Sequence, residues 1–274
     1  MGTRLRILML VTMLVLFGNL AAARSGEDAR PVLLAQASQV DIQNRGAEES
    51  DVQKRARLRM ELAVNYFEER RFSVALDELK QALTLVPNYA DAIGVLALVY
   101  MELGEKNLAE QSFRRAMQLK PDDSDLNVNF GWFLCSTGRE RESISFFLTA
   151  LKNPLYTRPA LPYQNAGVCS LKFRDVTAAE NYLKRSFELD PRGRIAAVSL
   201  AQIFYDRGEY DRARFYVAKI NQSDGAYPES VWLGAKIERK LGNRNEEASL
   251  LAQLRRLFPN STEAAALARG AYDD

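Results

Sequence analysis

From Arg55 onward, apolar and small residues return at a fixed interval along the chain. Pro87 and Pro121 lie 34 residues apart, and the residues that precede each proline share one register. Within a unit the apolar positions are three and four residues apart, which predicts two amphipathic helices, and the proline ends the second helix. The corresponding positions are Leu62-Ala63, Tyr66, Ala75, Leu79 and Ala82 in the first unit, and Leu96-Ala97, Tyr100, Ala109, Phe113 and Ala116 in the second.

Further units follow in which the pattern is less regular. The 34-residue spacing resembles that of the tetratricopeptide repeat (TPR) family. Each helix pair leaves an apolar face uncovered, so stability comes from stacking the next pair on it. We therefore predict an all-α, right-handed superhelical solenoid of about six TPR helix pairs over residues 55–274. The predicted repeats are 56–89, 90–123, 124–159, 160–193, 194–227 and 228–261, followed by a C-terminal cap.

The first 23 residues have the three parts of a secretory signal. Arg4 and Arg6 precede an apolar run from Ile7 to Phe17, and Ala21-Ala22-Ala23 offers a small-residue cleavage site. We expect cleavage before Arg24. An uncleaved anchor and a later site at Ala35-Gln36-Ala37 are the alternatives. Residues 24–54 lack a sustained apolar period, so they are predicted to be a flexible linker.

Leu16-Phe17-Gly18-Asn19 resembles a bacterial lipoprotein box in which Asn19 stands where the acylated cysteine belongs. Without that thiol there is nothing to acylate. On this sequence the mature protein is expected to be soluble unless a partner tethers it.

Charge and composition narrow the function classes. The chain has 37 Lys and Arg against 35 Asp and Glu, and loss of residues 1–23 removes Arg4 and Arg6 and no acid, leaving 35 against 35. A neutral chain does not attract nucleic acid over long range. There is no histidine, which removes the usual general base and the commonest metal ligand. We predict a protein that is not an enzyme and has no cofactor, no metal site and no nucleic-acid partner.

Cys135 and Cys169 occupy nearly matching places in the first helices of the third and fourth repeats. Those helices are neighbours in a TPR stack, so an oxidising compartment favours a disulfide between them. Two buried free thiols are the alternative.

The register of the first helices also predicts a groove that holds a partner polypeptide. The first-repeat positions that form a lysine and asparagine carboxylate clamp in some TPR proteins are apolar here, so no such clamp is expected there. Arg139, Arg141, Arg255 and Arg256 are interpreted as solvated charge. The predicted groove residues are Met60, Val64, Phe67, Leu98, Met101, Trp132, Tyr205 and Trp232, of which Trp132 is the preferred candidate.

Several short sequence motifs in the chain resemble those of the type IV pilus biogenesis and stability proteins of the PilF/PilW family. They include 75–82 (ALDELKQA), 131–135 (GWFLC), 151–156 (LKNPLY), 165–171 (NAGVCSL) and 237–242 (IERKLG). The likeness covers residues 55–274.

The resemblance implies a pilotin at the periplasmic, inner face of the outer membrane. Its expected partners are type IV pilus secretin subunits, which it helps to reach that membrane and multimerise, in support of twitching motility. It also implies the disulfide, because the family's paired cysteines match Cys135 and Cys169. Family members are usually lipoproteins, but Asn19 stands in place of the acylated cysteine here. Association with the outer membrane is therefore expected either through a partner or through a lipid anchor. We expect a monomer. The alternative function is a general envelope scaffold, such as an outer-membrane protein assembly component.

Overall fold

The computed structural model describes residues 50–222 and 226–270, and within these ranges every regular element is a helix. The predictions for the signal peptide, for Asn19 and for most of the linker lie outside the described residues. In chain order the helices are α2 Asp51–Glu68, α3 Phe72–Leu85, α4 Ala90–Glu102, α5 Lys106–Leu119, α6 Ser124–Ser136, α7 Glu140–Ala150, α8 Ala160–Lys172, α9 Val176–Leu189, α10 Arg194–Asp206, α11 Tyr210–Asn221, α12 Pro228–Leu241, α13 Arg244–Leu257 and α14 Thr262–Ala268.

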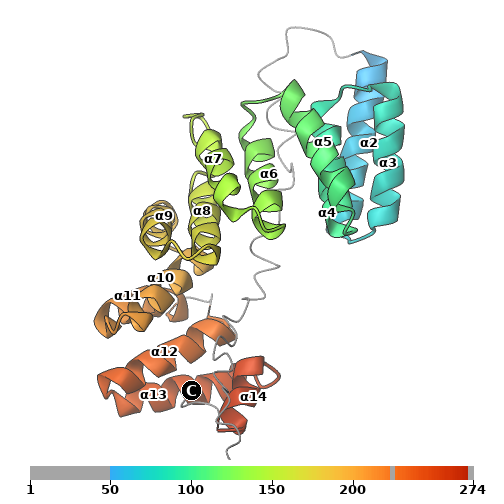
Figure 1. The fold of residues 1–274 in the computed structure, drawn as a ribbon. Coiled ribbons are helices and arrows are strands. Elements are labelled where there is room, and N and C mark those ends of the chain that lie inside the picture. Colours follow the sequence, from blue (N-terminus) through green and yellow to red (C-terminus); the bar gives the residue numbers. More distant parts are fainter. Residues whose placement is uncertain (1–49, 223–225, 271–274) are drawn as a thin grey trace, which may run out of the picture. The chain divides into compact units, whose positions relative to one another are not determined.

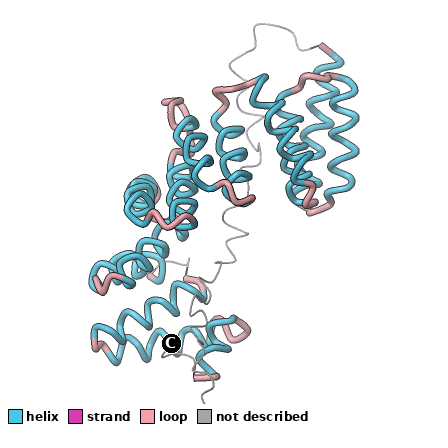
Figure 2. The backbone as a smooth tube through the Cα atoms, in the orientation of Figure 1, coloured by secondary structure: helices cyan, strands magenta, loops and turns pink. Residues whose placement is uncertain are grey.

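The helices form six antiparallel pairs that follow one another in chain order (Figures 1 and 2). We call the first helix of each pair the A helix and the second the B helix. Each A helix packs on its own B helix and on the B helix before it, and α2, α4, α6, α8, α10 and α12 also contact one another in succession. The fold is therefore the TPR-like solenoid that the repeat pattern predicts, and α14 adds a short helix after the last pair.

The first A helix begins before the predicted end of the linker. Residues 51–54 are helical, whereas the linker was predicted to run to residue 54. The reason is a capping box: Ser50 Oγ accepts a hydrogen bond from the Gln53 backbone N–H at 3.2 Å, and the Ser50 N–H donates to Gln53 Oε1 at 3.0 Å. These two bonds satisfy N–H groups that otherwise lack a partner at a helix start.

Close approach of the A and B helices requires a small residue at one A-helix position. Alanine fills it in the first two repeats, at Ala63 and Ala97, where both residues are fully buried. Glycine fills it in the third and fourth repeats, where an added Cβ atom would run into a side chain of the B helix. A Cβ atom on Gly131 would lie 2.7 Å from Phe147 Cε1, and one on Gly167 would lie 2.5 Å from Leu183 Cγ.

The turn between the A and B helices is left-handed at one residue of each pair. Glycine holds four of these positions, for example Gly104 at φ 79°, but Arg70 and Arg174 hold the others at φ 60° and 64°. A side chain in this region costs about 1–2 kcal/mol relative to glycine. These two turns therefore carry backbone strain that the other four avoid.

The connection from α7 to α8 is longer than the other turns and is anchored to α6. Asp125 Oδ1 accepts hydrogen bonds from Tyr156 Oη at 3.0 Å and from Arg158 Nη2 at 2.9 Å. Burial raises the pKa of the Asp125 carboxyl, opposed by the nearby Arg158 charge and the Tyr156 bond. The loop is thus ordered by a partly buried ion pair, and it leaves Leu155 83% exposed.

Candidate functional site

Four of the eight predicted groove residues are buried, which contradicts their assignment to an exposed surface. Met60 and Leu98 are fully buried, and Val64 and Phe67 are 8% and 7% exposed. All four belong to the core cluster of the first repeats. The physical reason is that an A helix has helices on two sides, so most of its apolar face meets the neighbouring pair instead of solvent.

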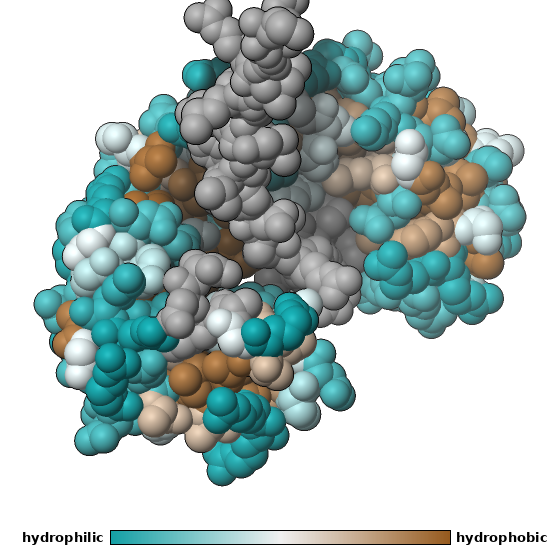
Figure 3. All heavy atoms as spheres, turned by 60° about the horizontal axis from the view of Figure 1, so that its bottom comes forward, coloured by the Kyte–Doolittle hydropathy of each residue, from teal (hydrophilic) through white to brown (hydrophobic). Residues whose placement is uncertain are grey.

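The other four predicted residues, Met101, Trp132, Tyr205 and Trp232, are half-buried. Met101 packs against the core of the first repeats. Trp232 packs near the C-terminal end of the solenoid, against a cluster that contains Leu254. Figure 3 shows one face of the molecule as a mostly hydrophilic surface interrupted by separate hydrophobic patches. Trp132 and Tyr205 are the two that combine partial exposure with nearby charge.

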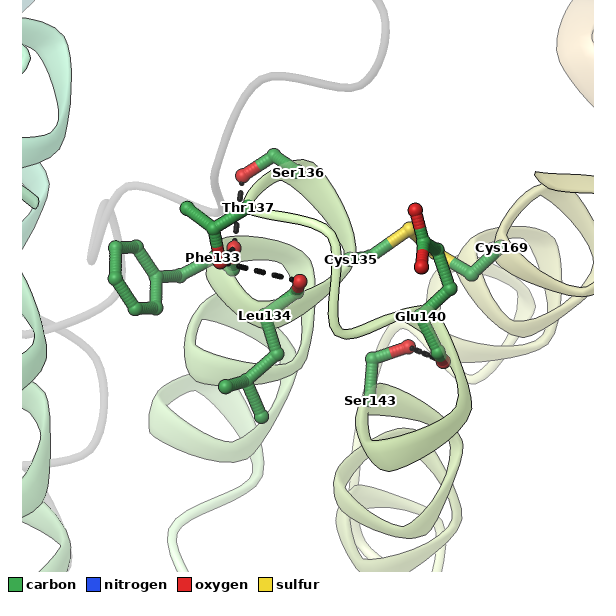
Figure 4. The surroundings of a disulfide bond; sticks show 8 residues. All are labelled: Phe133, Leu134, Cys135, Ser136, Thr137, Glu140, Ser143 and Cys169. Atoms are coloured by element: carbon green, nitrogen blue, oxygen red, sulfur yellow. Dashed lines mark hydrogen bonds between the residues drawn. A yellow bond between two sulfur atoms is a disulfide. The ribbon is translucent and has the colours of Figure 1, made fainter. Parts of the chain in front are cut away.

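Trp132 lies beside the bond that joins the third and fourth repeats. Cys135 Sγ on α6 and Cys169 Sγ on α8 are 2.00 Å apart, and both cysteines are buried. Trp132 packs against the cluster formed by these cysteines, Phe147 and Ala166. Figure 4 shows the disulfide crossing between the two helices, with the Glu140 side chain from the start of α7 beside it. The covalent link therefore holds the helix that carries Trp132 against its neighbour.

Two cations stack on aromatic rings around this link. Lys172 Nζ, at the end of α8, lies 5.7 Å from the centroid of the Trp132 ring. The next residue, Phe173, has its ring 4.6 Å from Arg141 Cζ on α7. Lys172 and Arg141 are exposed, whereas Trp132 and Phe173 are half-buried. We call Trp132, Arg141, Lys172 and Phe173 the cation–aromatic patch.

A second pair of the same kind lies between the fifth and sixth repeats. Lys236 Nζ on α12 is 5.7 Å from the centroid of Tyr205 on α10, and Tyr210 meets the same ring edge-on at 5.5 Å. Burial raises the pKa of the Tyr205 hydroxyl, as do the neighbouring Tyr210 and Asp206. Burial also raises the pKa of Asp206, opposed by its bond from Gln202 and by the Lys236 charge.

Other charged clusters are internally neutralised and tie repeats together. Arg139 bonds Glu110 of the preceding repeat and Glu142 of its own helix, each at 2.7 Å. The bonds from Arg139 and Arg114 hold the pKa of Glu110 below its usual value. Arg139 is therefore a structural residue. Arg141, two positions later, forms no ion pair with any described residue.

The repeat pattern does not indicate Lys172 or Phe173, nor the contact that Arg141 makes. The spacing of 40 residues between Trp132 and Lys172 follows no rule of the repeat. The available signal was compositional: a lysine and an aromatic residue end an A helix next to the one that carries a tryptophan. Which ring each cation meets depends on how neighbouring pairs are rotated.

Neither a metal site nor a membrane span emerges from the described residues. No group of three or more His, Cys, Asp or Glu side chains among them is placed to hold a metal ion. None of the helices described is both long and apolar enough to cross a membrane.

Known proteins that resemble this chain have the same fold, and several of them are type IV pilus proteins. A tetratricopeptide repeat family model matches residues 60–124 and 171–228. The type IV pilus assembly protein PilF of Pseudomonas aeruginosa is 29% identical over 157 residues, which cover 57% of this chain and 62% of that protein. The match thus spans somewhat less than two thirds of that relative's length.

Two solved structures of the same group match along nearly their full length. The crystal structure of PilW, described as a widely conserved type IV pilus biogenesis factor, is 33% identical, with a TM-score of 0.69 over 77% of this chain and 97% of that one. The Pseudomonas aeruginosa PilF structure is 27% identical, with a TM-score of 0.72 over 81% of this chain and 100% of that one. Since a relative above 30% identity is covered almost completely and shares the helix-pair architecture, this chain belongs to the PilF and PilW family of TPR proteins of type IV pilus biogenesis.

Proposed function

We propose that this chain is a non-catalytic assembly factor for type IV pili that binds secretin subunits and promotes their outer-membrane localisation and multimerisation. The observation that carries the proposal is the match to the PilW biogenesis factor over 97% of that structure. Because function resides in surfaces and not in the fold, the TPR architecture alone does not select the partner. The A-helix aromatics that remain half-buried, Trp132 and Tyr205, supply the contact surface in this proposal.

The protein works in the periplasm, at the inner face of the outer membrane, after export by the N-terminal signal. With Asn19 in place of the lipobox cysteine, this proposal has a partner, and not a lipid anchor, hold the protein there. Labelling cells with a lipid precursor tests this part, and incorporation of label into the mature protein contradicts it.

Deletion of the gene tests the main proposal. We expect secretin multimers to disappear from immunoblots of mildly denatured envelopes while secretin monomer still accumulates. The wild-type gene restores the multimers, and a Trp132→Ala variant restores fewer. Normal multimers in the deletion strain refute the proposal. A pull-down from envelope extract separates it from general scaffolding, since retention of barrel-assembly subunits in place of secretin identifies the other role.

A further inference from the structure

The cation–aromatic patch of Trp132, Arg141, Lys172 and Phe173 contains two cations and no acid, unlike the charged clusters around Glu110 and Glu180. Lys172 and Arg141 are exposed and have no ion-pair partner among the residues that the structure describes, while the cations around Glu110 and Glu180 all bond carboxylates. In the patch each cation instead contacts an aromatic ring. Two cations without an ion pair among the described residues therefore each lie over a half-buried ring, and the rings' partners Lys172 and Arg141 meet them from α8 and α7.

The patch lies beside a covalent cross-link between two repeats. Its residues come from α6, α7 and the end of α8, and the Cys135–Cys169 bond joins two of these three helices. Trp132 packs directly against the disulfide cluster. A surface that is already ordered loses less conformational entropy on binding than a flexible one does. Binding of a ligand at the patch therefore costs little conformational entropy of the protein.

We propose that the cation–aromatic patch binds an acidic segment of a partner polypeptide in which carboxylate side chains alternate with apolar or aromatic ones. Carboxylates pair with Lys172 and Arg141, and the apolar side chains cover the rings of Trp132 and Phe173. This inference rests on the proposed function, because it names the chemistry of the client that the solenoid holds. The site lies in the third and fourth repeats, away from the first-repeat positions where the sequence excludes a carboxylate clamp.

A polypeptide fits these observations better than an anionic membrane surface does. Recognition of such a surface requires clusters of about four to eight Lys or Arg residues, each contributing about 1 kcal/mol. The patch has two cations without an acid partner, and the whole chain is close to neutral. Half-buried aromatic rings beside cations match the composition of protein interfaces, where aromatic residues and arginine are enriched.

The test uses the purified full-length protein with Trp232→Phe, so that Trp132 is the only tryptophan and reports binding by fluorescence. The probe is a capped 12-residue peptide in which glutamate alternates with leucine and phenylalanine, compared with the same peptide carrying glutamine for every glutamate. We expect the glutamate peptide to bind at least about tenfold more tightly. Its advantage falls in about 1 M salt, where the Debye length is about 3 Å.

Lys172→Gln and Arg141→Gln are each expected to weaken binding of the glutamate peptide about fivefold. This factor corresponds to about 1 kcal/mol, which is the upper end of the range for an exposed ion pair. Lys219→Gln is the matched control: Lys219 Nζ lies 5.8 Å from the centroid of the exposed Phe215 ring on α11, so it has the same stacking in another place. Its removal should leave binding unchanged. Circular dichroism and an intact disulfide establish that each variant is folded.

Equal binding of the two peptides, or no effect of Lys172→Gln and Arg141→Gln, overturns the inference. A third arm uses phosphatidylcholine vesicles with and without phosphatidylglycerol. Binding to the anionic vesicles that both variants lose, without binding of the peptide, overturns it in favour of a lipid headgroup. Tight binding of the glutamate peptide together with normal secretin multimers in the deletion strain leaves the inference standing and refutes the proposed function instead.

Discussion

Substitution of Gly131 by alanine tests how closely the helices of the third repeat approach. The added Cβ lies 2.7, 2.9 and 3.1 Å from three atoms of the Phe147 ring. Ordinary contact begins near 3.4 Å, so the ring has to move by about 0.7 Å. Phe147 is fully buried against the disulfide cluster, which leaves it little room. Overpacking of this kind costs about 1–3 kcal/mol.

Part of that loss is recovered, because alanine is favoured over glycine inside a helix by about 0.5–1 kcal/mol. We therefore expect Gly131→Ala to lower the free energy of unfolding by about 0.5–2 kcal/mol, measured by urea denaturation with the disulfide intact. Gly94→Ala is the matched control. Its Cβ would lie 2.5 Å from Leu126 Cδ2, one atom at the end of a buried aliphatic side chain, and the next atom is 3.9 Å away, whereas the Gly131 Cβ meets three atoms of a rigid ring. Its loss should be smaller.

A double-mutant cycle separates the steric clash from a general loss of packing. Phe147→Leu removes the ring atoms that the Cβ of residue 131 would meet. Phe147→Leu should therefore be less costly in the Gly131→Ala background than in the wild type. Additive effects of the two substitutions, or a Gly131→Ala protein as stable as the wild type, would show that the close approach is not what constrains this position.

Three further outcomes follow from the structure. Replacing Cys135 and Cys169 by alanine should lower the free energy of unfolding by about 3–4 kcal/mol in urea denaturation, since the bond closes a 34-residue separation, and equal stability of oxidised and reduced wild-type protein contradicts this. At the left-handed turns, Arg70→Gly should raise the free energy of unfolding and Gly104→Ala should lower it, each by about 1 kcal/mol in the same assay. No atom lies within 4 Å of a Cβ on Gly104, so backbone strain and not a steric clash is the cause there. If both substitutions change the free energy of unfolding in the same direction, backbone strain is not the explanation. Burial raises the pKa of Asp125 in the folded state, so its carboxyl contributes stability below the unfolded value that is lost as pH rises through the folded one. Asp125→Asn should remove this decline from the pH dependence of unfolding, and an unaltered pH profile rules it out.

The sequence by itself determined the repeat, the helix pairs and the family. Fixed positions for small and apolar residues specify where two helices approach, and this holds whatever their neighbours are. For that reason α4, α6, α8, α10 and α12 begin at Ala90, Ser124, Ala160, Arg194 and Pro228, the first residues of the predicted repeats. Because the repeat register fixes the A helices, it also placed Cys135 and Cys169 on the neighbouring A helices α6 and α8.

The tertiary structure decided which apolar residues are available to a partner. Helical periodicity shows that Met60 and Trp132 lie on apolar faces, but it does not show whether such a face meets another helix or solvent. Stacking buries Met60 completely and leaves Trp132 half-exposed. It likewise pairs Arg139 with acids and leaves Arg141 on a ring, because the rotation between adjacent pairs, which no single repeat encodes, sets the distances between their side chains.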